Sequence, residues 1–118
     1  GSYVSLVAPG GDLTVDQNSD GYPDGILQQT FKSDPNGFAY WFFQGTSMAT
    51  PHVSGLAALL ASRGVTGPDK IRAAMEATAR DLGPAGWDPE YGWGMIDAYA
   101  ALAYRTPGDL GGDNAVDR

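Results

Sequence analysis

The sequence predicts an α/β fold in which short strands and helices are joined by many tight turns. Brief apolar or aromatic runs over residues 4–8, 26–31 and 38–43 have the length and composition of strands. Apolar residues at helical spacing follow over residues 47–62 and 68–80. The 17 glycines, 8 prolines and only 18% of charged residues favour short elements over long helices.

The N-terminal part of the chain is expected to form a strand, a polar loop and a hairpin. The strand over residues 4–8 is ended by a Pro-Gly-Gly turn. Residues 12–25 are a loop rich in Asp and Gly. Residues 34–37 read Asp-Pro-Asn-Gly, and Asn-Gly is a strong turn signal between two strands. The runs on either side of this turn are therefore predicted to pair as a hairpin.

The first helix is expected over about Ser47 to Ser62. Its residues are apolar on most sides, which predicts a buried helix. Pro51 is tolerated only in the first turn of a helix, which places the helix start near residues 46–48. Gly64 is expected to end the helix, because glycine readily adopts the left-handed conformation that follows a last turn.

Two shorter helices follow. Pro68 suits the first position of a helix that runs to about Arg80. A connector rich in Gly, Trp and Pro covers residues 83–94. The last helix is expected over about residues 96–104, with Asp97 near its positive end. The remaining polar residues to 118 are predicted to be a linker or the start of a further module.

Composition excludes several function classes. The formal net charge is −7 and the seven Lys and Arg residues are scattered, which argues against a nucleic-acid partner. No apolar run approaches the roughly 18–20 residues needed to cross a bilayer, so no membrane partner is expected. The absence of cysteine excludes disulfides, thiolate chemistry and zinc–thiolate sites.

The most informative segment is residues 45–55, Gly-Thr-Ser-Met-Ala-Thr-Pro-His-Val-Ser-Gly. It places Ser47 at the start of the first helix, where unpaired amides create a partial positive charge. A tetrahedral oxyanion formed at Ser47 would be stabilised by that field and by the backbone N–H of the serine. Gly45 would let another backbone approach closely. The same residues are also an ordinary helix cap, since Ser and Thr satisfy orphan amides.

This segment resembles the serine signature of the subtilisin-like peptidase family, Gly-Thr-Ser-Met-Ala-x-Pro-His-Val-x-Gly, at every fixed position. Residues 4–10 resemble the family's strand and Ala-Pro-Gly turn, and residues 91–98 its closing Gly-x-Gly segment. The resemblance implies the C-terminal portion of a three-layer α/β domain with a mostly parallel sheet over residues 1–104, here incomplete. It also implies a secreted serine endopeptidase with a polypeptide substrate.

The resemblance assigns roles to individual residues. It implies that Ser47 is the acyl-forming nucleophile. It also implies that Gly45 and Thr46 support the oxyanion and the backbone around the serine. It implies that Pro51 and His52 are structural neighbours of the site. His52 follows Ser47 by five residues, which is about 140° away around a helix, so it is expected to be a packed residue and not the base.

The family's other catalytic residues lie upstream of the serine, and none is present in this chain. Without the base, triad enzymes lose roughly 10⁴- to 10⁶-fold in rate. The chain alone is therefore expected to be inactive, and its expected partner is the upstream half of the same peptidase domain. The alternative is a non-catalytic calcium-binding or structural fragment that keeps the signature as a fold element.

The acidic loop, residues 12–25, contains a candidate calcium site. Oxygen ligands alternate at Asp16, Asn18, Asp20 and Asp24, with the carbonyl of Tyr22 among them, as at the front of an EF-hand loop. The position that would carry a bidentate carboxylate is a leucine, and no helices flank the loop. Calcium as a structural cofactor is one interpretation, and a solvated acidic turn is the other.

Within the tail, residues 105–118, the segment over residues 108–117 faintly resembles the opening of a dockerin calcium repeat. A glycine stands where a ligand would be expected, and the pattern stops early. A flexible linker is the alternative interpretation.

Overall fold

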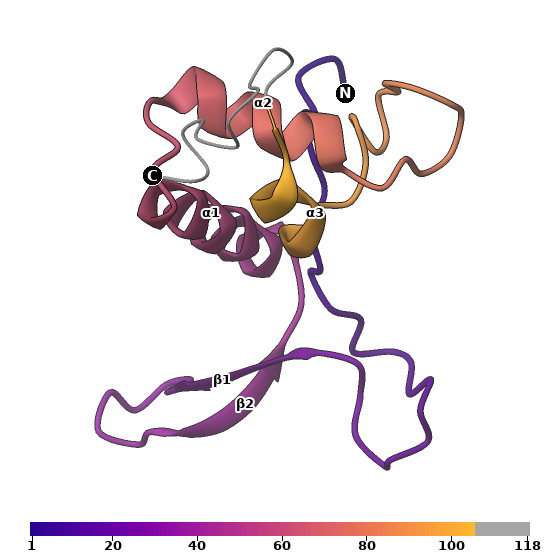
Figure 1. Ribbon diagram of the computed structural model, residues 1–118. Helices are drawn as coiled ribbons and strands as arrows, with labels where there is room; N and C mark the ends of the chain where they lie inside the picture. Colours follow the sequence, from indigo (N-terminus) through magenta and orange to yellow (C-terminus); the bar gives the residue numbers. More distant parts are fainter. Residues whose placement is uncertain (106–118) are drawn as a thin grey trace. The chain divides into compact units, whose positions relative to one another are not determined.

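The computed structural model describes residues 1–105 (Figure 1). The chain divides into two compact units. Residues 9–52 are called the hairpin unit, and residues 1–8 with those from 53 onward the helical unit. Apart from Arg105, the predicted linker or calcium repeat lies outside the described residues.

The hairpin unit contains the predicted hairpin. Strand β1 (Ile26–Thr30) pairs antiparallel with β2 (Ala39–Phe43), with Ile26 opposite Phe43. In the turn, the N–H of Gly37 donates to the carbonyl of Asp34 at 2.9 Å, and the N–H of Asn36 donates to its Oδ1 at 2.9 Å. The turn expected at residues 34–37 is therefore present, and the Asp34 side chain helps to close it.

Helix α1 (Thr46–Ser62) begins where the sequence predicts. Pro51 is the sixth residue of the helix and lies in its second turn, not within the first turn as expected. It has no N–H to donate to the carbonyl of Ser47, so the helix continues past it with one fewer i→i−4 bond. The helix ends as predicted: Gly64 has a φ of 92°, and the N–H of Val65 donates to the carbonyl of Leu60 at 3.1 Å.

The core lies in the helical unit. Helices α2 (Pro68–Thr78) and α3 (Ala98–Ala103) contact each other and contribute to it together with the later turns of α1. Both lie within the ranges that the sequence predicts. The buried apolar residues are Leu56, Leu60, Val65, Ala74, Met75 and Ala101.

The prediction that α1 is buried on most sides is wrong for the described residues. Leu56 and Leu60 are buried, but Leu59 is 49% exposed. A Cβ placed on Gly55 would meet no atom within 4 Å. The reason is that residues 1–105 cover only one side of this helix, whereas its composition suits contact on several sides.

Residues 4–8 do not form the predicted strand. Only Val7 pairs, in a single parallel bridge with Met95. The N–H of Val7 donates to the carbonyl of Gly94 at 3.0 Å, and the N–H of Ile96 donates to the carbonyl of Val7 at 3.1 Å. The N–H of Trp93 also donates to the carbonyl of Ser5 at 2.8 Å, but these bonds do not extend into the continuous ladder that a strand needs. The only multi-residue ladder in the described part is the hairpin.

Two glycines make the contacts around this bridge possible. Gly94 has a φ of 122°, and a Cβ on it would collide with the carbonyl of Arg80. Gly92 has a φ of 59°, and a Cβ on it would collide with the carbonyl of Ser5. Both positions combine a left-handed backbone with direct backbone contact, which requires glycine.

Candidate active site

Ser47 is the second residue of α1 and is exposed. Its backbone N–H belongs to the first turn, where amides have no acceptor within the helix. The hydroxyl therefore lies at the positive end of a 17-residue helix. This is the position at which an oxyanion would be stabilised.

Gly45 shapes the turn before the serine. It has a φ of 133°, which glycine adopts readily, and its carbonyl accepts the N–H groups of Met48 at 3.0 Å and Ala49 at 3.3 Å. The amides of Thr46 and Ser47 come earlier in the same turn. Thr46 is exposed, like the serine that follows it.

His52 and Pro51 lie one turn further along α1, and both are exposed. The Nδ1 of His52 lies 2.8 Å from the carbonyl of Met48. Because a carbonyl only accepts, this nitrogen carries the proton in that bond. The imidazole is thus held by its own helix, and it is not packed in the core of the described residues.

Two hydrogen bonds that the sequence does not suggest hold the residues before the serine. The side-chain Oε1 of Gln44 accepts the backbone N–H of Leu13 at 2.6 Å. The N–H of Gly45 donates to the carbonyl of Gly10 at 2.8 Å. Both bonds link residues more than thirty positions apart, so no local sequence pattern predicts them.

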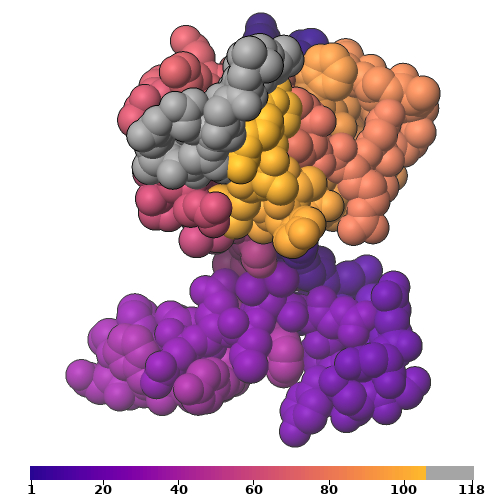
Figure 2. Space-filling model, viewed as in Figure 1, coloured from indigo at the N-terminus to yellow at the C-terminus, as the bar shows by residue number. Residues whose placement is uncertain are grey.

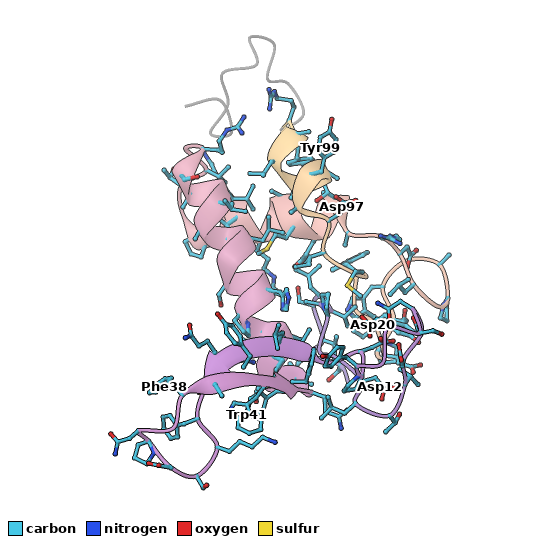
Figure 3. All side chains as sticks on the ribbon, turned by 90° about the horizontal axis from the view of Figure 1, so that it is seen from below. Asp12, Asp20, Phe38, Trp41, Asp97 and Tyr99 are labelled. Atoms are coloured by element: carbon cyan, nitrogen blue, oxygen red, sulfur yellow. The ribbon has the colours of Figure 1, made fainter. Side chains whose placement is uncertain are left out.

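The acidic loop lies at the surface of the hairpin unit (Figure 2). Figure 3 shows Asp12 and Asp20 on this loop, at the end of the hairpin opposite to Phe38. The loop is closed at its base, because the N–H of Asp12 donates to the carbonyl of Asp24 at 2.9 Å.

The candidate calcium ligands accept hydrogen bonds from the loop backbone. Asp16 Oδ2 accepts the N–H of Gly21 at 3.0 Å, and Asp20 Oδ1 accepts that of Tyr22 at 2.9 Å. Asn18 donates its amide to Asp20 Oδ2 at 2.9 Å, and Asp24 Oδ2 accepts the N–H of Gln17 at 3.0 Å. Among residues 1–105, no three His, Cys or acidic side chains are placed to share a metal. The donor atoms suit calcium, but this arrangement equally suits a self-bonded turn.

The carboxyl group of Asp12, at the start of the acidic loop, accepts two hydrogen bonds from Thr14. The hydroxyl of Thr14 donates to its Oδ1 at 2.6 Å and the N–H of Thr14 at 2.8 Å, and these bonds lower the pKa of the carboxyl group. Both bonds favour the ionised form.

None of the helices among the described residues has the length and apolar character needed to span a bilayer.

Comparison with known proteins shows similarity to serine proteases. The chain is 38% identical over 104 residues to a thermophilic serine proteinase of Bacillus sp. (strain AK1), across 88% of this chain and 21% of that protein. It is 48% identical over 59 residues to an extracellular serine protease of Serratia marcescens, of which it covers 6%. The chain therefore spans only a small part of these relatives.

The fold is also found in a solved structure. The crystal structure of fervidolysin from Fervidobacterium pennivorans, which is related to subtilisin, matches 89% of this chain and 19% of that one, with 31% identity and a TM-score of 0.63. This confirms a partial subtilisin-like α/β domain. The family model described as the subtilase family matches residues 2–94. Because that match covers well over half of the chain, the chain belongs to the subtilase family.

Proposed function

We propose that this chain is the nucleophile-bearing part of a serine endopeptidase that acts on polypeptides. The observation that carries the proposal is the exposed Ser47 at the first turn of a long helix, within the complete serine signature. Kinship with serine proteinases supports the same reaction class.

In the proposed reaction, Ser47 Oγ attacks the carbonyl carbon of a peptide bond and a base removes its proton. The helix field and the N–H of Ser47 stabilise the oxyanion, with Gly45 and Thr46 setting the backbone around it. The C–N bond then breaks, the amine leaves with a proton, and water hydrolyses the acyl-enzyme.

The base and its orienting carboxylate are proposed to come from the upstream half of the domain. His52 does not serve as the base in this proposal, since its Nδ1 is bonded to the carbonyl of Met48 and it lies on the same helix as the nucleophile. In this proposal the chain alone retains only a small fraction of the catalytic rate. We place the protein outside the cell, as the name of the Serratia relative states for that protein.

A serine-directed fluorophosphonate tests the proposal. The chain combined with its upstream half should be labelled at Ser47, while the chain alone should react far more slowly. Ser47→Ala should abolish the label, and Ser54→Ala, which changes another serine of α1, should keep it. If the assembled protein is not labelled, the alternative of a non-catalytic structural or calcium-binding fragment is favoured.

We also propose calcium as a structural ligand of Asp16, Asn18, Asp20, Asp24 and the carbonyl of Tyr22. The support is the oxygen-only donor set and its alternation along the loop. Calcium would stabilise the loop and take no part in acyl transfer.

Calorimetry with calcium chloride tests this second proposal. Asp16→Ala and Asp20→Ala should remove the binding heat, whereas Asp34→Ala, in the hairpin turn, should leave it unchanged. Equal heats in all three variants would dismiss the calcium site in favour of a solvated turn.

A further inference from the structure

We propose that Gln44 is a positioning residue for Ser47, which it serves by tying the turn before the serine to the base of the acidic loop. This inference rests on the proposed function. The carboxamide oxygen of Gln44 accepts the backbone N–H of Leu13. It acts through the backbone of the residues that follow it.

The tie consists of two hydrogen bonds on consecutive residues. Gln44 Oε1 accepts the N–H of Leu13 at 2.6 Å, and the N–H of Gly45 donates to the carbonyl of Gly10 at 2.8 Å. Both lead from the turn before Ser47 to the same short segment, residues 10–13. One bond alone would leave the turn free to rotate about it, and two bonds fix its direction.

The segment at the other end of the tie has little room to move. A Cβ on Gly10 would lie 2.8 Å from the carbonyl oxygen of Gly45. A Cβ on Gly11 would lie 2.9 Å from the carbonyl oxygen of Phe43 and 3.0 Å from the backbone nitrogen of Ile26. The segment is thus packed against the paired ends of β1 and β2, and it provides a firm anchor for the Gln44 side chain.

The tie matters for chemistry because Ser47 follows Gln44 by only three residues. Gly45, which lies between them, is the residue with the most conformational freedom, so the turn does not hold itself in place. Nucleophilic attack requires the oxygen within about 3–3.5 Å of the carbonyl carbon, and a misplacement of about 1 Å can cost about 10²-fold in rate.

The test measures inactivation of the assembled peptidase, this chain with its upstream half, by a fluorophosphonate. Gln44→Met keeps the length of the side chain and removes the acceptor, and it should lower the maximal inactivation rate about 10- to 100-fold with little change in the half-saturating concentration. Gln44→Glu keeps an acceptor oxygen and should restore the rate to within about threefold, since a carboxylate accepts an N–H well. Gln29→Met makes the same change at an exposed position of β1 and should have no effect.

The outcomes separate the two proposals. If the unaltered assembly is not labelled at all, the proposed function fails. If it is labelled and Gln44→Met reacts at the same rate, Gln44 does not position the serine. A loss that Gln44→Glu does not rescue overturns the inference as well.

A second substitution keeps the inference testable if Gln44→Met does not fold. Gln44→Asn stays polar and is one methylene shorter, so its oxygen no longer reaches Leu13. The inference expects the same fall in maximal rate for Gln44→Asn, at an unchanged circular dichroism spectrum. A wild-type rate in this variant contradicts it.

Discussion

Several aspartates of this chain act as acceptors for backbone amides. Asp97 Oδ1 accepts the N–H of Ala100 at 3.0 Å and caps α3 (Figure 3). The buried Asp88 accepts the N–H groups of Glu90 at 2.8 Å and Tyr91 at 2.9 Å through Oδ1. Some of the aspartate side chains therefore stabilise turns and a helix start, in addition to any role in ligand binding.

The Asp12–Thr14 pair gives a prediction about pH. The bond from the Thr14 hydroxyl is the first cause of the lowered pKa of Asp12, and the backbone bond from Thr14 is the second. The folded-state pKa is thus below the unfolded one. The contribution of Asp12 to stability is present above the unfolded pKa, about 3.9, and is lost as the pH falls through the folded pKa. Thr14→Val should raise the pKa of Asp12 towards its ordinary value, as followed by NMR titration of its carboxyl carbon.

The backbone bond remains in that variant, so the pKa should stay somewhat below the ordinary value. Thr66→Val makes the same change at an exposed loop position of the helical unit and should leave the titration of Asp12 unaltered. An identical midpoint in the Thr14→Val variant would show that the hydroxyl bond is absent in solution.

At the scale of elements, the two faces of α1 differ sharply in solvent exposure. Leu60 is fully buried, while the adjacent Leu59 is 49% exposed. Leu60→Ala should lower the free energy of unfolding by about 2–5 kcal/mol, because it leaves a cavity in the core. The change is measured by urea denaturation followed through tryptophan fluorescence. Leu59→Ala in this chain should cost less than about 1 kcal/mol, since much of that side chain is already in water. Equal losses would mean that α1 is covered on both faces.

The hairpin and the helix boundaries could be predicted because their signals are local. The Asn-Gly pair lies in the turn, Pro68 begins α2, and Gly64 ends α1. The prediction of a strand at residues 4–8 was wrong because a strand needs hydrogen-bonding partners elsewhere in the fold, and the sequence of one segment does not reveal them. Pro51 was expected in the first turn of α1 and lies in the second, since a helix tolerates the loss of one hydrogen bond when its other residues favour helix.

The candidate site was predicted as a sequence motif, whereas the hydrogen bonds that hold the motif in place are seen only in the structure. Ser47 and the turn at Gly45 are local features of one segment. The bond from Leu13 to Gln44 joins residues 31 positions apart, and a glutamine side chain carries no sign of its partner. Whether the acidic loop binds calcium stays a prediction, because the oxygen pattern of a calcium loop and that of an acidic turn share the same residues.

At the scale of the whole molecule, residues 1–105 leave one face of α1 without contacts that its apolar composition suits. The exposed side chain of Leu59 and the open position at Gly55 lie on a helix rich in apolar residues. The upstream half of the domain is the proposed cover. Leu59→Asp should weaken assembly with that half about 10- to 100-fold, since burying a leucine contributes about 1.5–3 kcal/mol and 1.4 kcal/mol is tenfold in affinity.

Binding of the two halves measured by calorimetry checks this expectation. Thr66→Asp introduces the same charge into the exposed loop between α1 and α2, and it should leave the affinity unchanged. If Leu59→Asp assembles as tightly as the unaltered chain, the upstream half does not cover this face.

The glycines at 92 and 94 have a consequence for directed evolution. Each sits with its Cα hydrogens against a neighbouring carbonyl, so even the methyl group of alanine has nowhere to go. In a library randomised at these two codons and selected for a folded product, survivors should encode glycine at both, while the exposed Trp93 between them should vary widely. A short stretch of the gene would thus alternate between positions that tolerate no change and one that tolerates many.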